Sequence, residues 1–440
     1  MKKLLSLLLA LVLCFGMTSC IAAHVDHTDY FVAKAAPKME ATYNDYGQRD
    51  FLAFLDKLDA FAAKLTAEVY ADSDKQTNVC ISPVSVYMAL ALTVECTEGD
   101  SRAEILDAVG VTYDEVKSFT KVLYALANRE YGYEDFLGKE KLAAFEELAN
   151  SIWADDGVVL KDAGVESLAD DYNCDLFRVD FGSGEGERAI ADYIQEKTHG
   201  LIDGKMELPA TTLITLINTF YLKDVWNSDG DDLPFTKETY EFENANGSTV
   251  KKKLLQGYYF NGKAYVGEGY TSFYTKTDHG FTIKFILPDE GRSLEEVFTA
   301  ENVYAANNVS DYGYRDDAYE LLHHTRVLFP EYSASFDGDL VSVLREEFGI
   351  ERVFSVEESD FSGITEETVY VDGVLHKCKL TVDKTGIEGA AATVIDGAGA
   401  GDPGSYTHVY HDFVVDRAFG FVLTDGYGTV LFSGAVNKIK

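Results

Sequence analysis

The spacing of apolar residues predicts helices mainly in the first half of the chain and strands mainly in the second half. Apolar residues recur at helical intervals over 51–65, 78–92, 142–154 and 190–199. Runs rich in β-branched and aromatic residues predict strands over 211–226, 254–259, 272–277, 281–287, 326–329 and 374–382, with a short helix over 341–348 and a final hairpin over 419–435. No convincing linker interrupts the pattern after residue 50. We therefore expect a single domain of the α+β class.

One stretch, from Gly386 to Gly404, is composed almost entirely of small residues. If it forms a strand, alternation places both of its charges, Glu388 and Asp396, on one face. The opposite face then carries no charge and consists of Ile387, Gly389, Ala391, Thr393 and Ile395. The glycines, in contrast, favour an exposed loop. The segment is therefore compatible with two states, a loop and a strand inserted into a sheet.

The composition limits the classes of partner. The chain has 440 residues, an apolar fraction of 46% and a formal charge of −36. This acidity disfavours nucleic acids and anionic membranes and favours cationic partners. The acidic residues are spread along the chain, as expected for a solvated surface.

The N-terminus has the pattern of an export signal. Lys2 and Lys3 precede a short apolar run, and small residues then lead to Cys20. This end is similar to a bacterial lipobox, in which Cys20 would be lipidated; the alternative is a plain secretory signal. Residues 21–46 are polar and predict a tether, followed by one domain over 47–440. We expect an exported monomer, extracellular or held at the cell surface by a lipid anchor alone.

The candidate metal and enzyme motifs are weak. The cysteines Cys80, Cys96, Cys174 and Cys378 have no regular spacing, which favours buried structural thiols. His408 and His411 are three apart and would face opposite sides of a strand, so a zinc site formed by these two is not expected. Ser118 with Lys121, Lys384-Thr385-Gly386 and Ser228-Asp229-Gly230 imitate motifs of penicillin-binding proteins and β-lactamases. The terminal hairpin does not suit that fold, and we expect no metal, no cofactor and no enzymatic activity.

Five sequence blocks, in order over residues 46–440, resemble the serpin family. They are NVCISPVS (78–85), IADYIQEKTHGLID (190–203), LINTFYLKDVWN (216–227), HKCKLTVDKTGIEGAAATVI (376–395) and DRAFGFVLTDGYGTVLFSGAVNKI (416–439). Tyr193 and Ala418 depart from the usual Trp and Pro. The resemblance implies a fold of helices and three β-sheets, with a large central sheet and an exposed reactive-centre loop at about 384–412.

The resemblance also implies a mechanism. A serine protease cleaves the loop as a substrate and forms an acyl-enzyme, and the cleaved loop then enters the central sheet as a new strand. The implied hinge is Lys384, Thr385, Gly386, Ile387, Glu388, Gly389, Ala390, Ala391, Ala392 and Thr393. The implied sheet-opening residues are Ser82, Ser85, Asn218, Trp226, Glu331 and His376. A non-inhibitory, binding-only serpin remains the alternative function.

Two counts place the scissile bond differently. Counting from the hinge by the usual family length gives Ala400, followed by Gly401. Counting back from Asp416 points near Thr407 instead, so the loop is longer than usual. A small residue at the scissile position suits the shallow pocket of elastase-like proteases. Ala398 and Tyr406 are alternative scissile positions. No Lys or Arg lies between Gly386 and His411, so trypsin-like targets are not expected.

The family usually has an acidic residue where this chain has Lys384, and a basic residue where it has Glu331. Because both signs are reversed, we expect a swapped Lys384–Glu331 ion pair at the entry to the sheet.

Overall fold

The structure is a computed structural model of the whole chain. It describes residues 25–37, 40–134, 140–209, 211–226, 232–310, 312–316, 319–388 and 406–440. Among these residues, no helix has both the length and the apolar character needed to cross a membrane.

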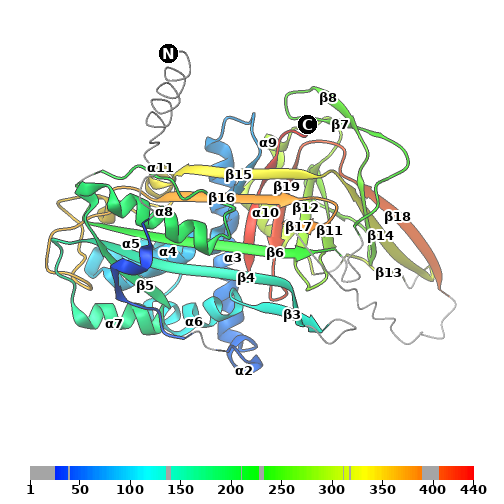
Figure 1. Cartoon of the computed structure of the whole chain (residues 1–440). Coiled ribbons are helices and arrows are strands. Elements are labelled where there is room, and N and C mark those ends of the chain that lie inside the picture. Colours follow the sequence, from blue (N-terminus) through cyan, green and yellow to red (C-terminus); the bar gives the residue numbers. More distant parts are fainter. Residues whose placement is uncertain are drawn as a thin grey trace, which may run out of the picture.

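A large mixed sheet runs through the middle of the molecule (Figure 1). In it β4 pairs in parallel with β5 and antiparallel with β6, from Phe145–Lys223 to Ala154–Ile214. The strands, in spatial order, are β1 (Phe31–Ala33), β5 (Cys174–Val179), β4 (Glu140–Asp155), β6 (Ile214–Val225), β17 (Gly386–Ile387), β16 (Leu375–Val382) and β15 (Tyr332–Asp339), with β3 (Glu130–Glu134) beside β4.

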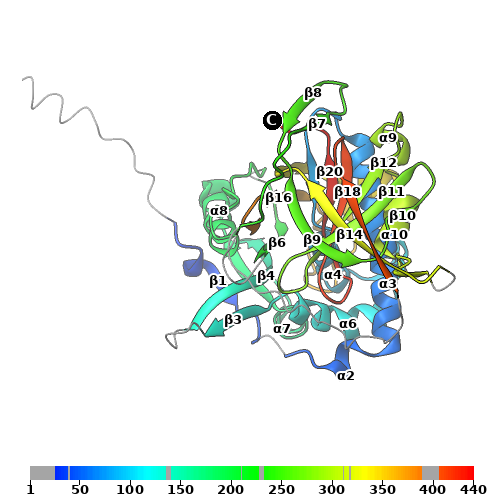
Figure 2. The same cartoon turned by 90° about the vertical axis from the view of Figure 1, so that its right-hand side faces the viewer.

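Two smaller sheets and a hairpin lie at one end of the central sheet (Figure 2). The first contains β10 (Tyr265–Val266), β11 (Tyr270–Lys276), β12 (Thr282–Pro288), β19 (Phe419–Thr424), β20 (Val430–Val436) and β2 (Val79–Ile81). The second contains β13 (Arg315–Asp316), β14 (Leu321–Phe329), β18 (Thr407–Val414) and β9 (Leu255–Asn261), and the hairpin contains β7 (Tyr240–Glu243) and β8 (Thr249–Lys252).

Helices cover both faces of the central sheet. Helix α8 packs on β4 and β6 from one side, and α4 packs between β6 and β20 on the other (Figure 1). The apolar face predicted over 51–65 belongs to α3, whose side chains Phe51, Phe54 and Leu65 are fully buried. The helices are α2 (Tyr43–Tyr46), α3 (Arg49–Asp72), α4 (Pro83–Cys96), α5 (Gly99–Val109), α6 (Tyr113–Leu126), α7 (Asp162–Asp171), α8 (Glu185–Lys197), α9 (Leu294–Val297), α10 (Ala300–Asn307) and α11 (Val341–Glu346).

Most predicted elements are confirmed, and one is wrong. Residues 142–154 belong to the strand β4, not to a helix. Helix α8 packs on one face of this strand and α4 on the other, so consecutive side chains over 148–154 are buried and the alternation typical of a half-exposed strand is lost. The helix predicted over 78–92 begins only at Pro83, because residues 79–81 form β2. The Ser82 hydroxyl donates to the carbonyl of Leu431 (2.8 Å) and does not cap the helix.

Part of the segment predicted as a tether has regular structure. His27–Tyr30 form a 3-10 helix and β1 pairs with β5 at the edge of the central sheet. The His27 side chain is buried, and its Nδ1 lies 2.8 Å from the Asp192 carboxylate of α8. These contacts attach residues 27–33 to the domain.

Candidate functional site: the hinge and the opening of the central sheet

The first residues of the predicted hinge already lie in the central sheet. Ile387 pairs with Val382 of β16 on one side and Asp224 of β6 on the other, which makes β17 a two-residue bridge between these strands. Ile387 is fully buried and Glu388 is half-buried. Their difference in burial agrees with the predicted alternation. Gly389, Ala390, Ala391, Ala392 and Thr393 lie outside the described residues.

A compact turn connects β16 to β17. The Asp383 carboxylate accepts hydrogen bonds from the Thr385 N–H (2.7 Å), the Thr385 hydroxyl (2.6 Å) and the Gly386 N–H (3.2 Å). A methyl group on Gly386 would overlap the Asp224 carbonyl oxygen and the Val225 Cα. Glycine is therefore required here because the backbone of β6 approaches so closely.

Trp226 fixes this turn to the end of β6. Its indole is 1% exposed, and its Nε1–H donates to the Asp383 carbonyl (2.6 Å). The ring also packs edge-on against Phe329, with centroids 5.4 Å apart. The residue that the family resemblance places at the entry thus contacts the turn that begins the hinge.

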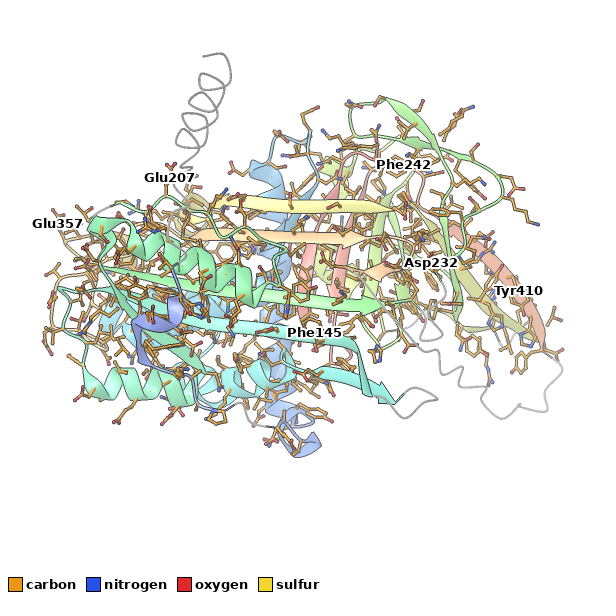
Figure 3. All side chains as sticks on the ribbon, viewed as in Figure 1. Phe145, Glu207, Asp232, Phe242, Glu357 and Tyr410 are labelled. Atoms are coloured by element: carbon orange, nitrogen blue, oxygen red, sulfur yellow. The ribbon has the colours of Figure 1, made fainter. Side chains whose placement is uncertain are left out.

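The predicted Lys384–Glu331 ion pair is wrong. The Lys384 ammonium contacts the Asp232 carboxylate, whereas Glu331 accepts a hydrogen bond from the Lys384 backbone N–H (3.1 Å). Asp232 lies near the β17 end of the central sheet, and Glu207 lies near the opposite end (Figure 3). Both carboxylates contribute to holding the pKa of Lys384 above its usual value, with Asp232 the larger contributor.

Below the hinge, the sheet-opening residues form two groups of hydrogen bonds between α4 and the strands. The Ser82 N–H donates to His376 Nε2 (3.2 Å). The Ser85 hydroxyl donates to the Asn218 side-chain oxygen, and the Asn218 amide donates to Asn150 (2.6 Å). Sequence reasoning missed Asn150, because its segment was predicted as a helix.

His376 is buried at the start of β16, and burial lowers its pKa to about 4. A neutral ring accepts the Ser82 N–H, whereas a protonated ring would have no lone pair for it. The hydrogen bond between Ser82 and His376 therefore requires the neutral form of the histidine.

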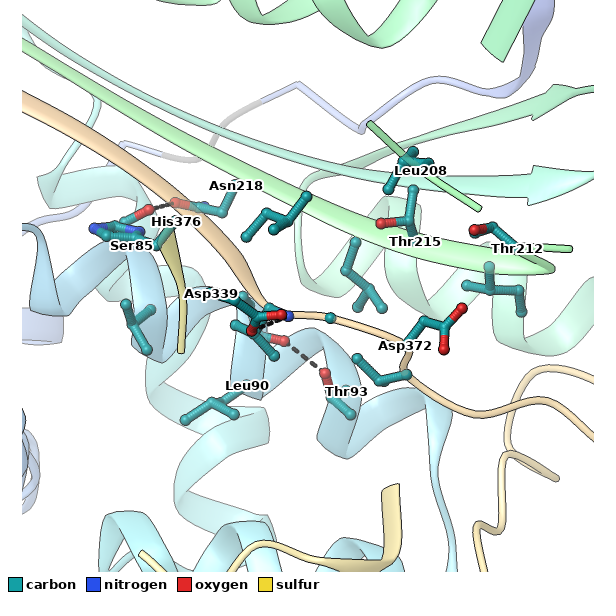
Figure 4. A pocket seen from close by; sticks show the side chains of 18 of the residues that line it. Ser85, Leu90, Thr93, Leu208, Thr212, Thr215, Asn218, Asp339, Asp372 and His376 are labelled. Carbon is teal, nitrogen blue, oxygen red and sulfur yellow. Dashed lines mark hydrogen bonds between the residues drawn. The ribbon is translucent and has the colours of Figure 1, made fainter. Parts of the chain in front are cut away.

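A cavity of about 290 Å³ separates the first part of β6 from the start of β16 (Figure 4). Ser85, Asn218 and His376 lie at one end of it, Thr212 and Asp372 lie toward the other end, and α4 forms its floor through Leu90 and Thr93. Within the part of the chain that the structure describes, no ladder joins β6 directly to β16, and β17 is their bridge. The cavity thus lies where a longer strand between β6 and β16 would continue from Ile387.

The candidate cleavage residues differ in what the structure says of them. Ala398, Ala400 and Gly401 lie outside the described residues. Thr407 is the first residue of β18, and its N–H donates to the Glu320 carbonyl (2.8 Å). Arg315 lies over the Tyr406 ring, 4.9 Å from its centroid. Because a protease needs an extended, accessible segment, these contacts disfavour Thr407 and Tyr406 as scissile residues. The predicted loop of about 384–412 also ends earlier, because β18 begins at Thr407.

Comparisons with known proteins show which family has this architecture. The family model described as "Serpin (serine protease inhibitor)" matches residues 56–439. The guinea pig (Cavia porcellus) "Serine proteinase inhibitor A3K" is 29% identical over 385 residues, which cover 84% of this chain and 85% of that protein. The mouse (Mus musculus) "Alpha-1-antitrypsin 1-1" is 27% identical and covers 88% of each chain. These family and protein names denote protease inhibitors and not enzymes. The alternative of a penicillin-binding protein or β-lactamase is therefore wrong.

Solved structures show the same fold. The thermophilic serpin tengpin in its native state superposes with a TM-score of 0.71 at 21% identity, over 92% of this chain and 98% of tengpin. Human thyroxine-binding globulin in complex with thyroxine superposes with a TM-score of 0.67 at 20% identity, over 88% of this chain and 99% of the globulin. The α+β architecture with a large central sheet is thereby confirmed, and the chain belongs to the serpin family.

Proposed function

We propose that this serpin inhibits serine proteases as a suicide substrate, with cleavage of its loop followed by insertion of the loop between β6 and β16. The observation that carries the proposal is the bridge formed by β17. Its two residues occupy the start of a strand position whose continuation is a cavity floored by α4. Insertion would pair the facing edges of β6 and β16, and unpaired backbone groups are costly when buried.

The target class follows from the loop sequence. Ala400, with Gly401 after it, is the proposed scissile position, and a small side chain suits elastase-like proteases. Inhibition of trypsin-like enzymes is not expected, because the loop has no Lys or Arg between Gly386 and His411. The formal charge of −36 should also accelerate association with cationic proteases, and salt should weaken that effect.

The test is incubation with pancreatic and neutrophil elastase, followed by denaturing electrophoresis. We expect a denaturant-resistant covalent complex and a released C-terminal peptide that begins at Gly401. An Ala400→Arg variant should lose elastase inhibition and gain trypsin inhibition. Cleavage without a complex, together with an unchanged melting temperature of the cleaved chain, would support the non-inhibitory alternative.

Export is a separate part of the proposal. Residues 1–20 carry the signal pattern and Cys20 is the proposed lipidation site, although these residues lie outside those described. A Cys20→Ala variant should lose incorporation of labelled palmitate and be released from the cell surface. The proposed monomer is checked by light scattering of the purified protein.

A further inference from the structure

Four of the nine histidines of the chain lie in two neighbouring strands, β14 and β18. These strands run in parallel, with His323 opposite Val409 and His324 opposite Tyr410. Successive side chains alternate between the faces of a sheet. The register therefore divides the four rings into an inner pair, His323 with His411, and an outer pair, His324 with His408.

The outer pair brings two ring nitrogens together at the surface. His324 Nε2 lies 2.8 Å from His408 Nδ1, and the ring planes differ by only 9°. His408 is exposed and His324 is half-buried. Tyr410 stacks on His324 with a centroid distance of 5.1 Å and Tyr314 contacts its edge at 5.7 Å, so that aromatic neighbours hold the His324 ring.

We propose that His324 and His408 form a binding site for one divalent transition-metal ion of the Zn²⁺, Cu²⁺ or Ni²⁺ class, which joins β18 to β14. Imidazole nitrogen is a preferred ligand for these ions. Two nitrogens bound to tetrahedral zinc at about 2.0–2.1 Å lie about 3.4 Å from each other. A small rotation of the exposed His408 ring opens the observed separation to that value, and water completes the coordination.

Charge also favours the outer pair. Two cations lie on this face. Arg326 is neutralised by two hydrogen bonds to the Asp412 carboxylate (2.9 and 3.0 Å). Arg315, which the register places beside Leu322, lies over the Tyr406 ring, 4.9 Å from its centroid. The acidity of the whole chain further raises the local concentration of cations.

The inner pair is less suited to a metal ion. His323 Nδ1 lies 3.0 Å from His411 Nε2, but His323 is only 6% exposed. Lys263 lies close enough to His323 for its positive charge to act on that ring. An ion there would lose its water and meet a like charge, and both effects weaken binding.

Among the described residues, one group of three possible metal ligands lies close together, namely Asp26, His27 and Asp192. Its members already satisfy one another and their neighbours. Asp26 accepts from the Thr28 N–H (2.9 Å) and hydroxyl (2.6 Å), and Asp192 lies against both the backbone N–H and the Nδ1 of His27. This cluster supplies a matched control for the proposed site.

The experiment is calorimetric titration of the untagged full-length chain with ZnCl₂ at pH 7.5. We expect binding that either His324→Ala or His408→Ala weakens by more than about tenfold, because one imidazole cannot chelate. Asp192→Asn and His199→Gln should leave the affinity unchanged. A His408→Cys variant, which keeps a zinc ligand at the same position, should retain binding and so separates loss of a ligand from loss of structure.

A second measurement uses Cu²⁺ as the probe. The electron paramagnetic resonance spectrum of the wild-type complex should show coupling to two imidazole nitrogens, and each alanine variant should lose one of them. Zinc should also raise the melting temperature of the wild type, since a ligand that binds only the folded state stabilises it. Absence of zinc binding by the wild type, or wild-type affinity in either alanine variant, would overturn the proposal. Neither readout requires a protease, so the result is independent of the proposed inhibition.

Discussion

The two halves of the central sheet are joined to their neighbours in different ways. On one side, β4 and β6 share a continuous ladder from Phe145–Lys223 to Ala154–Ile214, and β5 extends it. On the other side, β15 and β16 form an equally regular ladder from Tyr332–Val382 to Asp339–Leu375. Between these two ladders the described residues provide only the two-residue bridge of β17.

The difference shows where the sheet can change. Each ladder is closed along its length. The β4–β6 ladder packs against α8 and α4, and β15 and β16 pack against β2. The boundary between β6 and β16, in contrast, contains a cavity and a group of polar side chains. Serine, asparagine and neutral histidine can exchange hydrogen-bond partners without leaving a buried charge. The boundary is therefore suited to separation of the two halves, and four predictions test it.

The largest expected effect comes from a charge placed on the inserting face. In an inserted strand, the alternation that begins at buried Ile387 would place Ala391 on the inner face and Ala392 on the other face. Ala391→Glu should reduce the yield of covalent elastase complex by more than about tenfold, because a buried carboxylate opposes insertion. The yield is measured by denaturing electrophoresis. Ala392→Glu is the matched control and should retain the complex; equal losses would contradict the proposed alternation.

A methyl group at Gly386 should disturb the bridge itself. Gly386→Ala forces Cβ against the backbone of β6, so we expect a loss of about 1–3 kcal/mol in the free energy of unfolding. Chemical denaturation measures it. Gly426→Ala, where a Cβ meets no atom within 4 Å, should change stability much less. If the two variants unfold alike, the close approach of β6 and β17 is not present in solution.

The neutral His376 should make stability depend on pH. Its pKa is about 4 in the folded chain and about 6.5 when unfolded, so the unfolded state binds the extra proton between these values. Stability is fully retained above pH 6.5 and falls as the pH decreases toward 4, by about 3 kcal/mol in total. His376→Gln should remove this component from a series of urea denaturations. An unchanged pH profile in that variant would rule out His376 as its source.

The smallest expected effect concerns the ion pair at the entrance. Lys384 and Asp232 are exposed by 47% and 42%, and exposed pairs contribute little to stability. Lys384→Glu should lower the melting temperature slightly, and adding Asp232→Lys should restore it. Adding Glu331→Lys instead should restore less, because Glu331 accepts a backbone N–H. Equal restoration by the two double variants would argue against Asp232 as the partner.

Much of this architecture could be predicted from the sequence. Local signals predicted the helix α3, most of α4, the strands β6 and β16, and the final hairpin. The serpin-like blocks also indicated which residues meet at the hinge and beneath the sheet. Trp226 does contact the turn at Asp383, and His376 does accept from Ser82.

The errors arise where tertiary structure decides. Residues 142–154 have helical periodicity, yet they form β4 because strands flank it on both sides. The partner of Lys384, Asp232, is 152 residues away in the sequence, and nothing in the local pattern distinguishes it from Glu331. The histidine pairs depend on the register between β14 and β18, which spacing within one strand cannot reveal.

The short strand β17 also bears on the order of events after cleavage. Starting a new strand fixes several backbone dihedrals before many hydrogen bonds can form, and this nucleation step is the slow part of cooperative assembly. Here the first two residues are already seated, with Ile387 at 0% exposure. Insertion of a cleaved loop would therefore extend an existing strand and would need no new nucleus. Each further residue would then form backbone hydrogen bonds to both neighbouring strands.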